Sequence, residues 1–121
     1  MVSRKAFIDK ANQEGFSFNI QIPWWRYTNF KSLVWRKRIS EEQLYQIFLL
    51  LCREVEERQM QVVADKRKYQ TGFYVGECNG REFRFEFAFK KNQVLRVYNL
   101  FETVNGRKKL TLMDLLDYIM D

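Results

Sequence analysis

The sequence predicts a single α+β domain in which an antiparallel sheet of three to four strands carries two helices on one face. Three runs of alternating apolar and polar residues cover positions 69–103. Residues 41–59 and 112–120 instead repeat apolar side chains at helical spacing. With 121 residues, 46% of them hydrophobic, the chain can bury one core. We therefore expect residues 1–121 to form one domain.

The Asn79-Gly80 pair predicts the turn of a β-hairpin. Both central residues of a type I′ turn need a positive φ, which Asn and Gly adopt more readily than other residues. The alternating runs on either side predict strands near 69–78 and 81–89. A third strand is expected near 93–103, which completes an antiparallel meander.

A two-residue turn also fixes the register of this hairpin and gives its sheet one apolar face. Four phenylalanines at alternating positions project from that face: Phe83, Phe85, Phe87 and Phe89. Counting back from the turn pairs Gly76 with Phe83, Tyr74 with Phe85 and Gly72 with Phe87. The glycines leave room for large rings. The same register sets Glu77 opposite Glu82, which we interpret as two solvated acids, with a cation site as the alternative.

The amino-terminal part predicts a short helix and a fourth strand. Ser3 can cap a helix over residues 4–14, and Gly15 ends it. Alternation across residues 16–22 predicts a half-buried strand that stops at Pro23. We expect this strand to join the meander as a fourth strand, and a separate ribbon is the alternative.

The clearest helix covers residues 41–59. Ser40 and Gln43 form a capping box at its start. Its middle turns are apolar on nearly every side, so it must be covered on more than one face. The cover is either the sheet together with the amino-terminal segment, or a second subunit in a homodimer formed through this helix. Near the carboxyl end, Thr111 can cap the helix over 112–120, which we expect to pack on the phenylalanine face.

Composition excludes several classes of function. The chain has no histidine, which removes the commonest zinc ligand and the commonest general base. Its two cysteines are too few for a disulfide framework. The amino terminus lacks a secretory signal pattern and no apolar run is long enough to span a membrane. We expect a cytoplasmic protein with no cofactor, no bound metal and no membrane partner.

Positive charge is concentrated in a segment rich in aromatic residues. The formal net charge is +6, and residues 1–39 alone contain eight basic and two acidic side chains. Residues 24–38 read WWRYTNFKSLVWRKR, with no acid. Aromatic rings stack on unpaired bases, and arginine pairs with phosphate in a two-point fashion. Candidate contacts in this segment are Trp24, Trp25, Arg26, Tyr27, Lys31, Trp35, Arg36, Lys37 and Arg38.

Two basic loops add further candidate phosphate contacts. They contain Lys66, Arg67 and Lys68 before the hairpin, and Arg107, Lys108 and Lys109 after the Asn105-Gly106 turn. The sequence does not show whether these loops lie beside residues 24–38. Each of the three basic segments has a structural interpretation as well: buried rings with a solvated cationic rim for residues 24–38, a solvated turn for residues 66–68, and a charged surface that favours solubility for residues 107–109.

Three functions are compatible with these patterns, and we expect a binding protein rather than an enzyme. The first is a small basic protein that binds RNA or single-stranded DNA through residues 24–38. The second is an inhibitor or interaction module, of the kind encoded by phages and mobile elements, that binds an acidic protein surface or a nucleoprotein machine. The third is a histidine-free ribonuclease of the toxin type, with candidate residues Lys91, Arg96, Tyr98 and Glu102. No catalytic motif selects the third.

Overall fold

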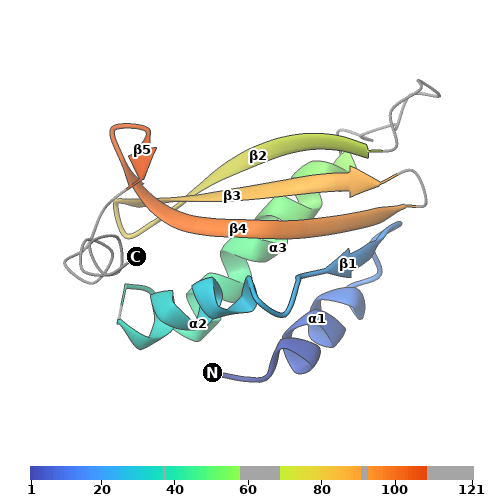
Figure 1. The fold of residues 1–121 in the computed structure, drawn as a ribbon, viewed down its shortest axis with the longest axis horizontal. Coiled ribbons are helices and arrows are strands. Elements are labelled where there is room, and N and C mark those ends of the chain that lie inside the picture. The colour runs from blue at the N-terminus through green and yellow to red at the C-terminus, as the bar shows by residue number, and fades with distance from the viewer. Residues whose placement is uncertain (37, 58–68, 91–92, 109–121) are drawn as a thin grey trace.

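The structure is a computed structural model that describes residues 1–36, 38–57, 69–90 and 93–108. Side chains at positions 69 and 70 are outside the description. Three helices and five strands occur in the described part (Figure 1). In chain order they are α1 (Arg4–Asn12), β1 (Asn19–Gln21), α2 (Tyr27–Trp35), α3 (Glu41–Glu57), β2 (Tyr69–Cys78), β3 (Arg81–Lys90), β4 (Val94–Val104) and β5 (Arg107–Lys108).

The sheet is mixed rather than wholly antiparallel. Strands β2, β3 and β4 form the predicted antiparallel meander, and β5 folds back on β4 in a second hairpin. The prediction of an entirely antiparallel sheet is wrong because β1 pairs with β4 in parallel, with Ile20 beside Leu95. Alternation assigned the buried face of β1, but it contains no information on the neighbour or on the direction of pairing.

The predicted register of the first hairpin is confirmed. Asn79 and Gly80 have φ of 53° and 74°, and the pairs from Cys78 and Arg81 to Gly72 and Phe87 follow the expected order. A side chain at Gly72 would meet the Phe87 ring at 3.0 Å. The opposed Glu77 and Glu82 are also present.

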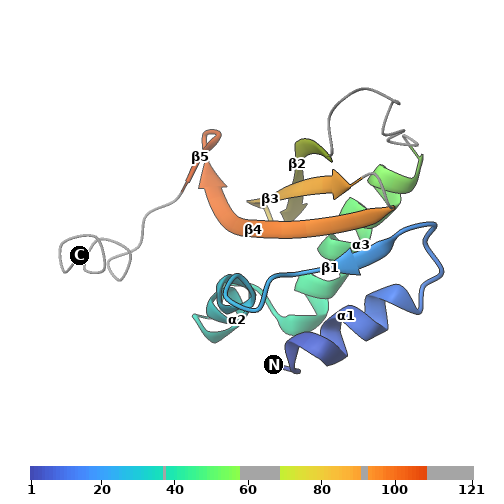
Figure 2. The same cartoon turned by 45° about the vertical axis from the view of Figure 1, so that its right-hand side comes forward.

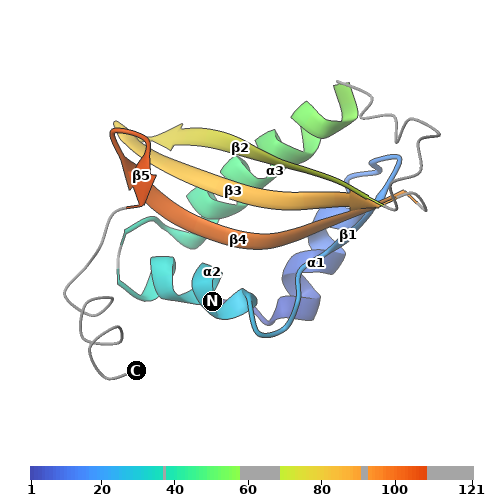
Figure 3. The same cartoon turned by 45° about the horizontal axis from the view of Figure 1, so that its top comes forward.

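Helix α3 crosses the phenylalanine face of the sheet, as Figures 1 and 3 show. An aromatic cluster joins the two layers: Phe48 of α3 lies 6.0 Å from Phe85 of β3 and 5.2 Å from Phe7 of α1, measured between ring centroids. Phe30 of α2 lies 6.0 Å from Phe48 in the same cluster. Such tilted and edge-on contacts are the favourable geometry for buried rings.

The same packing accounts for the apolar sides of α3 within one chain. Tyr45, Leu49 and Cys52 are all buried, whereas Leu50 is exposed. The sheet and the amino-terminal segment therefore supply the cover, and a second subunit is not needed for it. The homodimer through residues 41–59 stays a prediction without this support.

Both predicted helix caps of the described region are present. The Ala6 amide donates to Ser3 Oγ at 3.1 Å at the start of α1. At the start of α3 the Gln43 amide donates to Ser40 Oγ, and the Ser40 amide donates to Gln43 Oε1, each at 3.1 Å. The helix predicted over residues 112–120 lies outside the described residues.

The opposite face of the sheet has no described helix over it. Phe73 and Val75 of β2 are exposed there, and the Arg84 guanidinium lies 3.9 Å from the Phe73 ring centroid. Helix α2 lies beside β4, away from the β2 edge of the sheet, as Figure 2 shows. Residues from the open face and from α2 therefore meet along β4.

Candidate nucleic-acid interface

The aromatic and basic segment leaves the sheet at Pro23 and turns directly into α2. The carbonyl of Pro23 accepts hydrogen bonds from the amides of Arg26 (2.9 Å) and Tyr27 (3.1 Å). Tyr27 and Phe30 anchor one side of α2 in the core. The sequence predicted neither a helix nor a strand over residues 24–38.

All three tryptophans remain outside the core. The exposed fraction is 73% for Trp24, 47% for Trp25 and 85% for Trp35. Indoles at this exposure contribute little to the core, so the interpretation of the segment as buried rings with a solvated rim fails for its tryptophans. The rings are available to a ligand.

Tyr27 is a correction to the candidate contacts. It is 3% exposed, and its hydroxyl donates to the carbonyl of Val2 at 2.7 Å. Burial raises the pKa of Tyr27 to about 12, because the phenolate cannot be solvated inside the protein. Tyr27 therefore holds α2 against the amino terminus and does not reach the surface.

Four cations from the described residues line a pocket between α2 and β4. The pocket has a volume of about 180 Å³, and the basic residues that line it are Arg26, Arg36, Arg38 and Lys108. Lys108 comes from β5 and the three arginines from the α2 region. The structure thus brings together two of the three basic segments. We call this site the cationic pocket.

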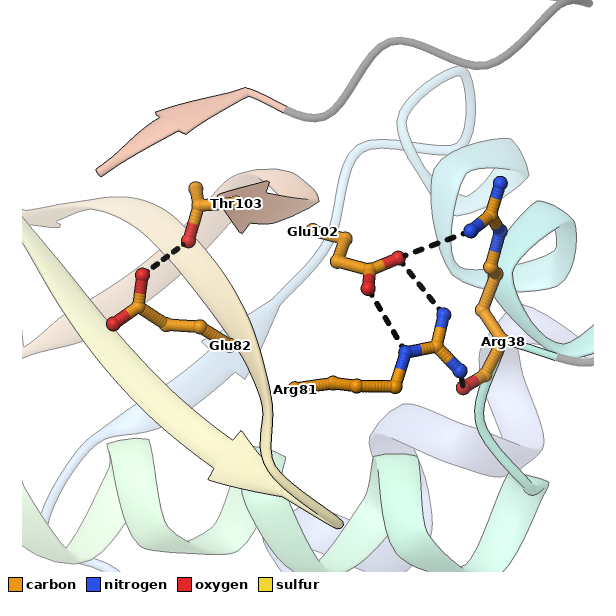
Figure 4. Close-up of polar contacts among 5 residues, drawn as sticks. All are labelled: Arg38, Arg81, Glu82, Glu102 and Thr103. Atoms are coloured by element: carbon orange, nitrogen blue, oxygen red, sulfur yellow. Dashed lines mark hydrogen bonds and ion pairs between the residues drawn. The ribbon is translucent and has the colours of Figure 1, made fainter. Parts of the chain in front are cut away.

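Among the described residues one acid, Glu102, lines the cationic pocket, and two arginines donate hydrogen bonds to its carboxylate. Glu102 is 7% exposed, and Arg81 donates to it from Nε and from Nη2, each at 2.9 Å. Arg38 Nη1 donates to the same carboxylate at 3.4 Å (Figure 4). The hydrogen bond to Glu102 raises the pKa of Arg81. Arg38 is therefore partly neutralised, and its first role is to position the chain between α2 and α3.

Arg26 connects the cationic pocket to an exposed ring. Its guanidinium carbon lies 4.4 Å from the Trp25 ring centroid, a cation–π distance. The Arg26 Nε is buried and has no hydrogen-bond partner among the described residues. A guanidinium stacked on an exposed indole can also donate to an anionic oxygen, through nitrogens other than the buried Nε.

The remaining candidates divide into exposed residues and residues outside the description. Lys31 is exposed on α2, and Arg107 is exposed on β5. The positions that lie outside the described residues are Lys37, Lys66, Arg67, Lys68 and Lys109.

Three residues at this site were not among the candidates from the sequence. Arg81 donates two hydrogen bonds to Glu102 of the cationic pocket. Asn29 Nδ2 donates to Asn99 Oδ1 at 3.3 Å, which joins α2 to β4. The signal for Arg81 was its place directly after the turn, in the alternation that includes Phe83. No local pattern predicts the contact of Asn29 with Asn99, since they are 70 residues apart.

Comparison with protein-family models, with curated proteins and with solved structures found no match for this chain. Its function must therefore be inferred from its own surface.

The described residues contain no group of three or more potential metal ligands drawn from Cys, Asp and Glu. No helix among them is long and apolar enough to cross a membrane.

The candidates for a ribonuclease do not form one site. Arg96 and Tyr98 line a pocket on the open face of the sheet. Glu102 lines the cationic pocket instead and is held by Arg81. Lys91 lies outside the described residues.

Proposed function

We propose that this protein binds single-stranded nucleic acid, either RNA or single-stranded DNA, along α2 and the adjoining edge of the sheet. The observation that carries the proposal is that one segment contributes three exposed indoles and three arginines of the cationic pocket, with Arg26 of the pocket stacked on Trp25. Phosphates would bind at the pocket, and unpaired bases would stack on the rings beside it.

Charge supports a polyanionic ligand. Arginine provides three of the four cations that the described residues place at the pocket, and its planar guanidinium forms bidentate contacts with phosphate. Glu102, the acid that the described residues place there, is already bound by this protein's own arginines. A phosphate approaching the pocket would therefore meet no uncompensated negative charge from Glu102.

The exposed indoles support a single strand over a duplex. Exposed indoles have no stacking partner on an intact duplex, because its bases are already stacked on each other.

The experiment is fluorescence anisotropy of a labelled 12-nucleotide single strand, measured from about 50 mM to 300 mM salt. We expect binding at low salt and a linear fall of log affinity with log salt, at roughly 0.7 per phosphate contact. No binding at about 50 mM salt would reject the proposal, and an acidic protein surface would then become the leading ligand. Labelled RNA recovered intact after incubation without metal would argue against the ribonuclease.

A further inference from the structure

A second pocket lies on the open face of the sheet, next to Trp25 of the proposed interface. It has a volume of about 420 Å³ and is lined by Pro23, Trp25, Ala88, Lys90, Arg96 and Tyr98. Two aromatic rings and two cations therefore share one small depression. We call it the aromatic slot.

An irregularity in β4 delivers Tyr98 to this slot. The register between β3 and β4 shifts between Glu86 and Phe87, where Glu86 pairs with Asn99 and Phe87 pairs with Val97. Tyr98 is the extra residue of this bulge. Since Val97 is buried in the core and Asn99 bonds Glu86 at 2.8 Å, the bulge places two consecutive side chains on the open face. Bulges commonly redirect a side chain in this way beside functional sites.

The floor of the slot is low because β3 has a small residue there. Ala88 interrupts the charged side chains on the open face of β3, between Glu86 and Lys90. It pairs with Arg96 of β4. A larger residue at position 88 would reduce the volume of the aromatic slot.

The charges at the slot select among ligands that aromatic rings can hold. Lys90 and Arg96 line it, and no acidic residue of the described chain does. Methylated lysine and other cations also bind between aromatic rings, but the positive charges of Lys90 and Arg96 would repel them. A neutral base attached to a phosphate satisfies both features.

We infer that the aromatic slot holds one unpaired nucleobase, with Lys90 and Arg96 contacting the phosphates that flank it. This inference rests on the proposed function and deepens it. Trp25 lines the slot, and Arg26 stacks on Trp25 while it lines the cationic pocket. A single strand can therefore run from the cationic pocket to the slot without leaving the surface.

The test compares two 12-nucleotide strands with equal phosphate counts, oligo(dA) and a strand in which abasic residues replace the bases. Base stacking should make oligo(dA) bind roughly 5-fold to 150-fold more tightly. Ala88→Leu fills the slot without removing a ring or a charge and should reduce that preference. Val75→Leu adds bulk at a distant point of the same face and is the matched control.

A pair of substitutions at Tyr98 separates the ring from its hydroxyl. Tyr98→Phe keeps the ring and should bind oligo(dA) as the wild type does, whereas Tyr98→Ala should bind more weakly. Circular dichroism verifies that each variant is folded. Since Ala88→Leu leaves Tyr98 in place, the test does not depend on Tyr98→Ala folding.

The outcomes separate this inference from the proposed function. Equal affinity for the two strands, or an unchanged preference in Ala88→Leu, would overturn the slot and leave nucleic-acid binding in place. If the protein binds neither strand, both the slot and the proposed function are overturned. A base preference that Ala88→Leu reduces and Val75→Leu keeps would support the slot.

Discussion

Arg81 and Glu102 form a two-point ion pair, with Nε and Nη2 of the arginine each 2.9 Å from a carboxylate oxygen. The pair joins the start of β3 to the end of β4. Arg81 also donates through Nη1 to the backbone carbonyl of Arg38 (Figure 4). One side chain thereby fixes the connection between α2 and α3, on which the cationic pocket depends.

Arg81→Met should destabilise the fold. The substitution removes both 2.9 Å hydrogen bonds from Arg81 to the buried carboxylate of Glu102, and we expect a loss of about 1.5–3 kcal/mol in the free energy of unfolding. Urea denaturation measures it. The matched control is Arg84→Met, because Arg84 meets Glu86 at 3.3 Å in a more exposed pair, where the loss should stay below about 1 kcal/mol. Equal losses in the two variants would contradict the role assigned to Arg81.

Gly76→Ala should be destabilising because α3 occupies the space that a side chain would need. A Cβ at position 76 would lie 2.6 Å from Cγ2 of Ile47. We expect a cost of about 1–3 kcal/mol from this overpacking. A double-mutant cycle with Ile47→Ala, measured by urea unfolding, should show that the cost falls when Cγ2 is removed. A Gly76→Ala protein as stable as the wild type would refute the close approach of α3 to β2.

Stability should decrease at alkaline pH. Burial raises the pKa of the Cys52 thiol from 9.0, and those of the Tyr27 and Tyr45 hydroxyls from 10.0, in each case to about 12. The folded protein then holds these protons more tightly than the unfolded chain does. Their contribution is complete below about pH 9 and is lost as the pH rises to about 12.

Unfolding in urea at pH 8, 9, 10 and 11 tests this dependence. Above its unfolded pKa, each group that stays protonated in the fold should cost about 1.4 kcal/mol per pH unit. Cys52→Ala should reduce the decline between pH 9 and 10, where the tyrosines contribute least. A free energy of unfolding that is constant to pH 11 would show that these groups are not buried as described.

Trp35→Ala should separate binding from folding. Trp35 is the most exposed of the three indoles, so we expect a stability change within about 0.5 kcal/mol and a loss of about 1–3 kcal/mol in affinity for single-stranded oligonucleotides. Leu50→Ala truncates another exposed apolar residue, on α3, and serves as the control for binding. Unchanged oligonucleotide affinity in Trp35→Ala would remove this ring from the interface.

The sequence predicted the hairpin register and the helix caps because these depend on neighbouring residues. The Asn79-Gly80 turn determines every pair along β2 and β3, and the Ser40 capping box determines where α3 begins. The direction of β1 depends on a partner more than 70 residues away, and no local pattern encodes it.

The candidate site was predictable in composition but not in arrangement. An acid-free run with three indoles made Trp24, Trp25 and Trp35 candidate contacts but left open whether they are buried, and the structure shows all three exposed. The burial of Tyr27 follows from the inward side of a helix that was not predicted. The meeting of Lys108 with the arginines around α2 arises from the β4–β5 hairpin, which returns the chain to β4. The aromatic slot depends on a bulge, which alternation alone does not reveal.

The most direct test of the account is the salt dependence of single-strand affinity in a variant that carries Arg36→Ala and Lys108→Ala. The matched control removes one positive charge from the exposed face of α3, through Arg53→Ala. We predict that the slope of log affinity against log salt falls by about 1.4 in the double variant, or roughly 0.7 per lost contact, and stays unchanged in the control. Equal slopes in the wild type, the double variant and the control would contradict binding of nucleic acid at the cationic pocket.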